Sequence, residues 1–512
     1  MKIPVTRSRW LSNYLRRLLL LLLLSGGILA ESARALGQGN TFQETILVAS
    51  NGSYQPAAFI DAHIENAWGI ALRPPGAGGH IWVSNARNAS TSLYIGDVNG
   101  IPLHQDGLKI LQLDGPLISY EGGLPQTTGQ VYNAASDLPN QPTEFPVSGP
   151  ASNWSSGTAV PIGNISGPAK FVFVTKDGTI NAWRANTAAS MNTAIVAMDY
   201  SDHGKDQLKE LPFLPAFTGV AITTEPPSLN DEGQAVADNR LYVTDFQNKI
   251  IRVINNQWTD ITVQVPFERP AGLAEGMSPY NIQDLNGKLY VTYAAVDTTS
   301  EEPAFDVPEE GGHVFVYDRD GHLLHGFQDE GLLRSPWGLA IAPAGFGKFG
   351  GKLLVASFGD GTIAAFDPNT GDFADLLRNP QGEPLKLDGL WGLAFGNGVS
   401  LGDASALYYT AGPNKEQDGV FGRVNAITTA APAVSVAAAA APVPARPANP
   451  VLSSAAADRQ TVRDFGAVGD GNADDTAAIE KAAQSGSIVF PSGTYRLTRT
   501  IKIDLAPPAS PR

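Results

Sequence analysis

A four-residue phrase that recurs along the chain constrains the fold more than any other feature. Trp-Gly followed by Ile or Leu and then Ala occurs at 68–71, 337–340 and 391–394, and looser versions start at 132, 218 and 280. Consecutive starts lie 54 to 86 residues apart. That period is long for a solenoid and typical of a four-stranded propeller blade with its loops. The repeats therefore predict six blades.

Strand patterns within the repeats predict how the ring closes. Most units supply four runs with strand character, but the sixth supplies three, at 391–396, 405–411 and 420–427. Residues 42–50 form a further strand candidate that precedes the first repeat. We expect this segment to complete the last blade, because closure removes the exposed edge of an open array. The fold class is all-β, a six-bladed β-propeller closed by an N-terminal strand.

The second repeat departs from the others in length. We place its first strand at 131–135, followed by an insertion rich in Pro, Ser, Asn and Gly over roughly 137–168. This placement puts Asn133 where other repeats have the glycine of the phrase, and Asn281 occupies the same place in the fourth repeat. Glycine suits the crowded axis of a propeller because it has no side chain. Asparagine is a common substitute where the backbone is left-handed.

These asparagines are candidate ligand or metal residues. If the inner strands line a central funnel, amide and carboxylate oxygens there would suit a divalent cation such as calcium. The alternative is that each Asn ends a strand or adopts a left-handed conformation. The funnel candidates are Asn66, Asn133, Asn281 and Asp284.

The N-terminus predicts export. Basic residues precede the leucine run at 18–24, and Ala33-Arg34-Ala35 has the small-x-small pattern of a cleavage site, so residues 1–35 are expected to be a signal peptide. The run is short for a membrane span. Residues 1–35 hold six basic residues and one acidic residue, so their removal lowers the net charge from −15 to −20. We expect a secreted or periplasmic protein that does not bind nucleic acid and has no membrane span when mature.

Composition divides the rest of the chain. Residues 36–427 carry the repeats, and 428–457 consist almost wholly of Ala, Pro, Val, Ser and Thr, as in a linker stiffened by proline. Patterned sequence resumes at 458 and forms a second module over 458–512. The chain contains no cysteine, so disulfides and thiolate chemistry are excluded.

Residues 36–427 resemble an uncharacterised family of bacterial secreted β-propellers. The resemblance rests on the Trp-Gly phrases and on the stretches TGQVYN at 128–133, FVTKDGTI at 173–180 and LYVTDF at 241–246. Some members of that family carry a C-terminal sorting tail of the PEP-CTERM type, which is replaced here by a different module. The resemblance implies the fold but supplies no catalytic residue.

The C-terminal module resembles the start of a pectate-lyase-superfamily β-helix of the rhamnogalacturonase and epimerase kind. The motifs are VRDFGAVGDG at 462–471, DDT at 474–476 and VFPSGTY at 489–495. A β-helix buries its core by stacking rungs, and we expect about one rung here, a truncated fragment without the later rungs that carry catalysis. Asp470, Asp474 and Asp475 are interpreted as a turn and a cap for a helix near 476–484, with a catalytic or calcium cluster as the alternative.

Three functions follow from these observations. The first is a secreted binding or scaffold propeller that recognises a carbohydrate or a cell-envelope partner. The second is a metal-dependent, lactonase-like hydrolase with its site in the funnel. The third is a polysaccharide-degrading enzyme whose lyase-like domain is truncated. An acidic chain repels polyanionic saccharides unless a local basic groove or a bound cation intervenes.

Overall fold

The computed structural model describes most of residues 41–427 and 462–499. The segments within these ranges that it leaves undescribed are 75–77, 116–124, 138–142, 155–157, 203–205, 207, 209–210, 224–227, 230–234, 237, 298–305, 330, 469 and 485–493. The expected signal peptide and the expected linker lie outside the described residues. By its contacts the chain separates into one compact unit before residue 434 and another after it.

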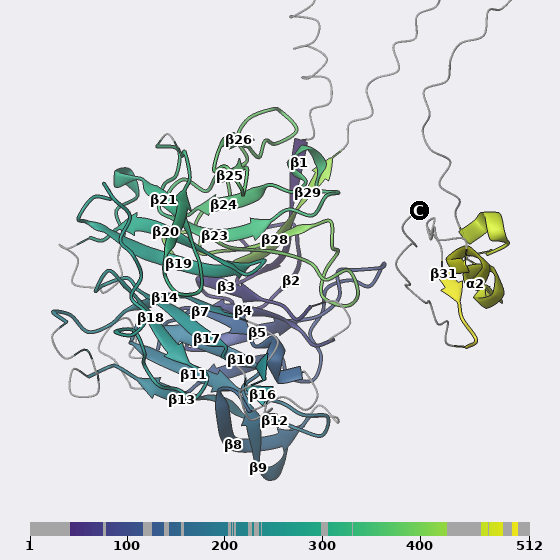
Figure 1. The fold of residues 1–512 in the computed structure, drawn as a ribbon, viewed down its shortest axis with the longest axis horizontal. Coiled ribbons are helices and arrows are strands. Elements are labelled where there is room, and N and C mark those ends of the chain that lie inside the picture. Colours follow the sequence, from purple (N-terminus) through teal and green to yellow (C-terminus); the bar gives the residue numbers. More distant parts are fainter. Residues whose placement is uncertain are drawn as a thin grey trace, which may run out of the picture. The chain divides into compact units, whose positions relative to one another are not determined.

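In the described residues, the first unit is a β-propeller of six blades (Figure 1). Blades 1 and 2 contain β3 (Ala67–Ala71), β4 (Ile81–Asn85), β5 (Ser90–Tyr94) and β6 (Ile110–Leu113), then β7 (Thr127–Tyr132), β10 (Phe171–Thr175), β11 (Thr179–Trp183) and β13 (Thr193–Asp199). Blades 3 and 4 contain β14 (Phe217–Ile222), β17 (Arg240–Asp245) and β18 (Ile250–Asn255), then β19 (Met277–Leu285), β20 (Lys288–Ala295), β21 (Gly312–Tyr317) and β22 (Leu323–Gly326). Blades 5 and 6 contain β23 (Pro336–Ile341), β24 (Leu353–Ser357), β25 (Ile363–Phe366) and β26 (Phe373–Leu376), then β27 (Leu390–Phe395), β28 (Leu407–Ala411) and β29 (Val420–Ile427).

The N-terminal strand completes blade 6, as the repeats predicted. β1 (Thr41–Ala49) pairs antiparallel with β29 along its whole length, from Thr41 opposite Ile427 to Ala49 opposite Val420. β2 (Ala57–Ile60) adds a parallel edge strand outside β1. The two ends of the propeller are thus joined by backbone hydrogen bonds between β1 and β29, so the facing edges of these two strands are both paired.

Two strand predictions were wrong. The inner strand of blade 2 is β7 at Thr127–Tyr132, so Thr128-Gly129 and not Tyr132-Asn133 takes the place of the Trp-Gly phrase. Residues 258–264 have the β-branched pattern expected of a fourth strand in the third repeat, but they form no strand. Blade 3 therefore has three strands, with an isolated bridge between Ile254 and Asp260. A left-handed backbone at Trp258, φ 60°, turns the chain where extension was expected.

The described parts of the insertion in blade 2 contain strands. Its strands β8 (Pro146–Asn153) and β9 (Val160–Pro168) form a hairpin to which β12 (Ser190–Met191) adds. One side of β8 is buried, because Val147 and Ala151 join the core of blades 1 and 2. The remaining short elements of this unit are η1 (Ala134–Asp137), β15 (Ser228–Leu229), β16 (Ala235–Val236), η2 (Pro308–Glu310) and η3 (Gly347–Phe349).

Blades 1 and 2 are also joined at their outer edges. Thr193 and Ala194 of β13 pair parallel with Gln112 and Leu113 of β6, which merges the two blades into one eight-stranded sheet. The other described blades are separate sheets. The outer strands of blades 1 and 2 are therefore held together by strand pairing.

The second unit is small and has its own core. It contains η4 (Val462–Phe465), β30 (Asp470–Asp474), α2 (Thr476–Gln484) and β31 (Thr494–Arg496), and β30 pairs parallel with β31. Its buried core consists of Val462, Ala467, Ile479 and Ala482. No helix in the described parts of the chain has the length and apolar character needed to span a membrane.

Candidate functional site

The predicted funnel residues do not form one site. Asn281 lies on the axis, where Cα of Asn281 would approach a Cβ at Gly219 to 2.7 Å. Its Nδ2 donates to the carbonyl oxygen of Trp337 at 2.8 Å, so its amide joins neighbouring inner strands. Asn133 lies beyond the end of β7 and not on the axis. Its Nδ2 donates to the carbonyl oxygen of Ala169, while its Oδ1 has no hydrogen-bond partner among the described residues.

Asn66 and Asp284 lie at opposite ends of inner strands. Asn66 precedes β3 with φ 44°, and its Oδ1 accepts from Trp391 Nε1 at 2.9 Å while its Nδ2 donates to Glu416 Oε2 at 2.7 Å. Asp284 is near the end of β19, where its Oδ1 accepts from the backbone N–H of Gly287 at 2.8 Å. The left-handed backbone of Asn66 fits the structural alternative. Within the described ranges, no group of three or more His, Asp or Glu residues is arranged to hold a metal ion.

Aromatic side chains fill the axis between these two ends. The rings of Trp68 and Trp391 stack with centroids 3.7 Å apart, and the ring of Trp337 meets both edge-on at 6.3 and 6.1 Å. These are the tryptophans of the repeated phrase, so the phrase builds a plug. The plug is possible because glycine follows each Trp: a Cβ at Gly338 would lie 2.3 Å from the carbonyl oxygen of Trp391.

A cavity of about 400 Å³ opens where the inner strands end. Gln130, Gln283 and Asp284 line it together with apolar residues such as Ile70 and Val220. It lies at the ends of the inner strands β3, β7, β14 and β19, where the sequence pattern predicted a funnel. Of the four candidates only Asp284 lines it, and Asn281 lines a smaller cavity of about 20 Å³ together with Trp337.

A buried polar cluster surrounds the plug where the inner strands begin. Lys176 Nζ lies 5.1 Å from the ring centroid of Trp68, and Tyr280 donates a hydrogen bond to Asp306 Oδ1 at 3.0 Å. Burial raises the pKa of Asp306 to about 6 and that of Asp177 to about 7. Asp177 Oδ2 accepts from the backbone N–H of Gln126 at 2.8 Å, but its Oδ1 has no partner in the described part of the chain.

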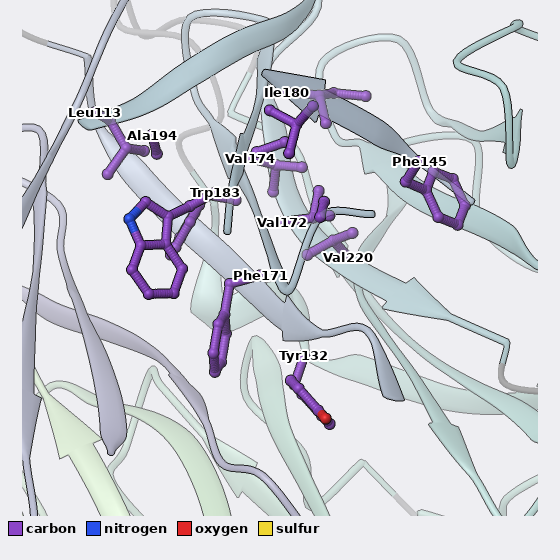
Figure 2. Close-up of a cluster of buried hydrophobic side chains, with 14 of the residues drawn as sticks. Leu113, Tyr132, Phe145, Phe171, Val172, Val174, Ile180, Trp183, Ala194 and Val220 are labelled. Atoms are coloured by element: carbon purple, nitrogen blue, oxygen red, sulfur yellow. The ribbon is translucent and has the colours of Figure 1, made fainter. Parts of the chain in front are cut away.

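A larger cavity, of about 600 Å³, lies in the wedge between blades 1 and 2. Phe171 of β10 and Trp183 of β11 contribute to its apolar wall. Phe171 is paired across strands, in one row, with Trp183 on one side and with Tyr132 of β7 on the other. Such residues project from the same face of a sheet, and Figure 2 shows Phe171 between Trp183 and Tyr132. Trp82 of β4 faces this row from blade 1, with its ring 4.2 Å from that of Phe171.

Charged side chains form the rim of this cavity. Asp137, at the end of η1, accepts hydrogen bonds from Arg73, Lys170 and the hydroxyl of Tyr132. Burial opposes ionisation of Asp137, but the bonds from Lys170, Tyr132 and Arg73 prevail and hold its pKa below the usual value. Arg184 also lines the cavity, and its Nη1 donates to the carbonyl oxygen of Pro168 at 2.9 Å. Cationic and hydrogen-bonding groups thus border an aromatic wall.

Sequence reasoning missed this cavity. Arg73 follows the first Trp-Gly phrase, and Phe171 and Trp183 belong to predicted strands, but their pairing across three strands depends on register. The alternation of Phe and Val in FVFVT at 171–175 was the available sequence signal, because alternate residues of a strand project from the same face. No sequence signal indicated the parallel pairing of β6 with β13, which joins the outer edges of blades 1 and 2.

The C-terminal carboxylates have structural partners. Asp474 Oδ1 accepts from the backbone N–H of Thr476 at 3.1 Å, and hydrogen bonds led by that from the Thr476 hydroxyl lower its pKa to about 2. Asp475 Oδ1 accepts from the backbone N–H of Val468 at 2.6 Å. These contacts match the interpretation of a turn and a helix start, and α2 begins at Thr476.

Fold and site together define a six-bladed β-propeller with a cavity between two blades and a small appended module. Residues 460–505 match the family model described as rhamnogalacturonase A/epimerase, pectate lyase-like. This match agrees with the resemblance found in the motifs of that module. It concerns the module alone.

Curated relatives share part of the chain. Uncharacterized protein L690 of Acanthamoeba polyphaga mimivirus is 32% identical over 193 residues, which are 37% of this chain and 50% of that protein. Uncharacterized protein R648 of the same virus is 32% identical over 198 residues, which are 38% of this chain and 47% of that protein. The chain thus spans about half the length of these curated relatives. They are viral, whereas the sequence motifs suggested a bacterial family.

Solved structures with a similar fold are distant in sequence. An α-L-arabinofuranosidase of Fusarium graminearum has a TM-score of 0.41 at 10% identity, covering 75% of this chain and 98% of that one. The soluble aldose sugar dehydrogenase of Escherichia coli has a TM-score of 0.37 at 11% identity, covering 75% of this chain and 99% of that one.

Proposed function

We propose that this protein is a ligand-binding β-propeller that takes a carbohydrate in the cavity between blades 1 and 2. The observation that carries the proposal is the cavity itself, about 600 Å³ in volume, with an aromatic wall and a rim of hydrogen-bonding side chains. A sugar ring has apolar C–H faces and hydroxyl groups at its edge, and ligand sites commonly combine an apolar lining with a few placed polar groups.

The wall is preorganised for binding. Trp82, Phe171 and Trp183 are each no more than 5% exposed and pack against one another, so their ring edges are fixed before a ligand arrives. Trp183 Nε1 donates to the carbonyl oxygen of Met191 at 2.8 Å, which fixes the indole further. A rigid wall reduces the entropy lost on binding.

Blocking the cavity tests the proposal. Thr187 lines the cavity and is exposed, and Thr187→Trp should fill part of it and weaken saccharide binding at least tenfold. Glycan-array screening of the full chain identifies a saccharide, and titration calorimetry then measures its affinity for each variant. The control is Ala188→Trp, an equally large change at an exposed neighbour that does not line the cavity. Equal affinity in both variants would place binding elsewhere.

We also propose that the protein acts outside the cytoplasm, as a member of a bacterial group of exported propellers. The support is the basic residues, leucine run and small-x-small pattern of residues 1–35. Expression in a bacterial host, followed by N-terminal sequencing of the exported protein, should find a chain that begins at Leu36. A full-length chain retained in the cytoplasm would contradict export.

A further inference from the structure

Arg184 places an uncompensated positive charge at the cavity between blades 1 and 2. Its guanidinium has no carboxylate partner among the described residues, and its Nε is buried without a hydrogen bond. Burial lowers the pKa of Arg184. A desolvated guanidinium is costly without a counter-charge, and its planar donors match a carboxylate in two-point geometry.

The other charged side chains at the cavity do not cancel this positive charge. Arg73 and Lys170 share one carboxylate, that of Asp137. His80 is paired with Asp106, Nε2 to Oδ1 at 2.6 Å. Among the described lining residues, three guanidinium or ammonium groups therefore face a single carboxylate.

This local excess is opposite to the charge of the whole protein. The full chain has a net charge of −15. An acidic protein repels anions at long range, so a cationic cavity within it indicates selection for an anionic ligand at short range. It is also the local basic groove that an acidic propeller would need to bind an acidic saccharide.

We propose that the saccharide bound in this cavity carries a carboxylate, as in a uronic acid, and that Arg184 receives this carboxylate. The inference rests on the proposed function and adds the charge of the ligand to it. The aromatic wall would contact the sugar ring while Arg184 neutralises the acid group. Arg73, Lys170 and Asp137 would bind the hydroxyls.

The test compares uronic-acid trisaccharides of gluco and galacto configuration with the matching neutral trisaccharides, by titration calorimetry on the full chain. At least one uronic-acid trisaccharide should bind about tenfold or more tightly than its neutral counterpart, and added salt should reduce this preference. Arg184→Gln should abolish the preference for the uronic-acid trisaccharide over its neutral counterpart. Arg184→Lys, which keeps the charge but not the planar fork, should restore part of it.

The control is Arg378→Gln, which removes one positive charge at the remote Asp375 pair in blade 5 and should leave all affinities unchanged. Equal affinity for acidic and neutral sugars would overturn the carboxylate assignment and leave the proposed function standing. Tighter binding of sulfated than of carboxylated trisaccharides would also overturn it. Binding of no saccharide would instead refute the proposed function.

Discussion

At the scale of single residues, the axial asparagines serve the architecture. Asn281 replaces a glycine of the repeated phrase and uses its amide to bind the backbone of the next blade. Asn66 connects Trp391 to Glu416 and so links the aromatic plug to the loop between β28 and β29. Both predicted positions are buried and hydrogen-bonded, which accounts for their residue type without a ligand.

Asp177 is the residue whose ionisation should matter for stability. Because its folded pKa is raised from 3.8 to about 7, the folded state binds more protons than the unfolded state between these values. The stability contributed by the protonated form is present below pH 3.8 and is lost as pH rises through 7. Asp177→Asn, which stays neutral, should be more stable than the natural chain at pH 8 by on the order of a few kcal/mol.

Thermal unfolding at pH 8, 6.5 and 5 measures this effect. The gain from Asp177→Asn should shrink steadily as the pH falls. Asp388→Asn, at an exposed position, should show no comparable trend. A gain that is the same at all three pH values would contradict burial of an ionisable group as the cause.

At the scale of elements, register decided what the strand pattern left open. The expected inner strand of blade 2 began at 131, whereas β7 spans Thr127–Tyr132. Gly129 is the residue that the axis requires, since a Cβ there would lie 2.9 Å from Cα of Gly219. Thr128 replaces the tryptophan and donates its hydroxyl hydrogen bond to the carbonyl oxygen of Phe217 at 2.7 Å. A search for an aromatic residue before the glycine therefore led to the wrong segment.

At the scale of the whole molecule, closure depends on one borrowed strand. Phe42 of β1 is fully buried, with its ring 5.1 and 5.5 Å from those of Phe346 and Phe349 in blade 5. Its backbone N–H donates to the carbonyl oxygen of Arg378 at 2.7 Å. The strand that pairs with blade 6 thus also packs on blade 5.

Phe42→Ala should lower the free energy of unfolding by about 3–5 kcal/mol, because it leaves a cavity at the seam. Calorimetric unfolding of the full chain checks this expectation. Phe373→Ala, on the half-buried outer strand β26, is the matched control and should cost clearly less. Equal losses of unfolding free energy would mean that Phe42 at the seam stabilises the fold no more than a residue of an outer strand does.

The number of blades, the closing strand and the separate C-terminal module could all be predicted from the sequence alone. Those features depend on local periodicity and on short phrases whose glycines and tryptophans have one physical use at a crowded axis. The sequence also supplied Asn281 as an axial residue.

The cavity between blades 1 and 2, by contrast, is evident only from the three-dimensional arrangement of the strands. The cavity between blades 1 and 2 needs Phe171 and Trp183 of one blade to meet Trp82 of the other. It also needs β6 and β13 to pair although 79 residues separate Leu113 from Thr193. Whether a charged side chain has an ion-pair partner likewise depends on which residues lie near it in space. Arg184 has no carboxylate partner among the described residues and a buried Nε without a hydrogen bond, and no local pattern encodes this combination.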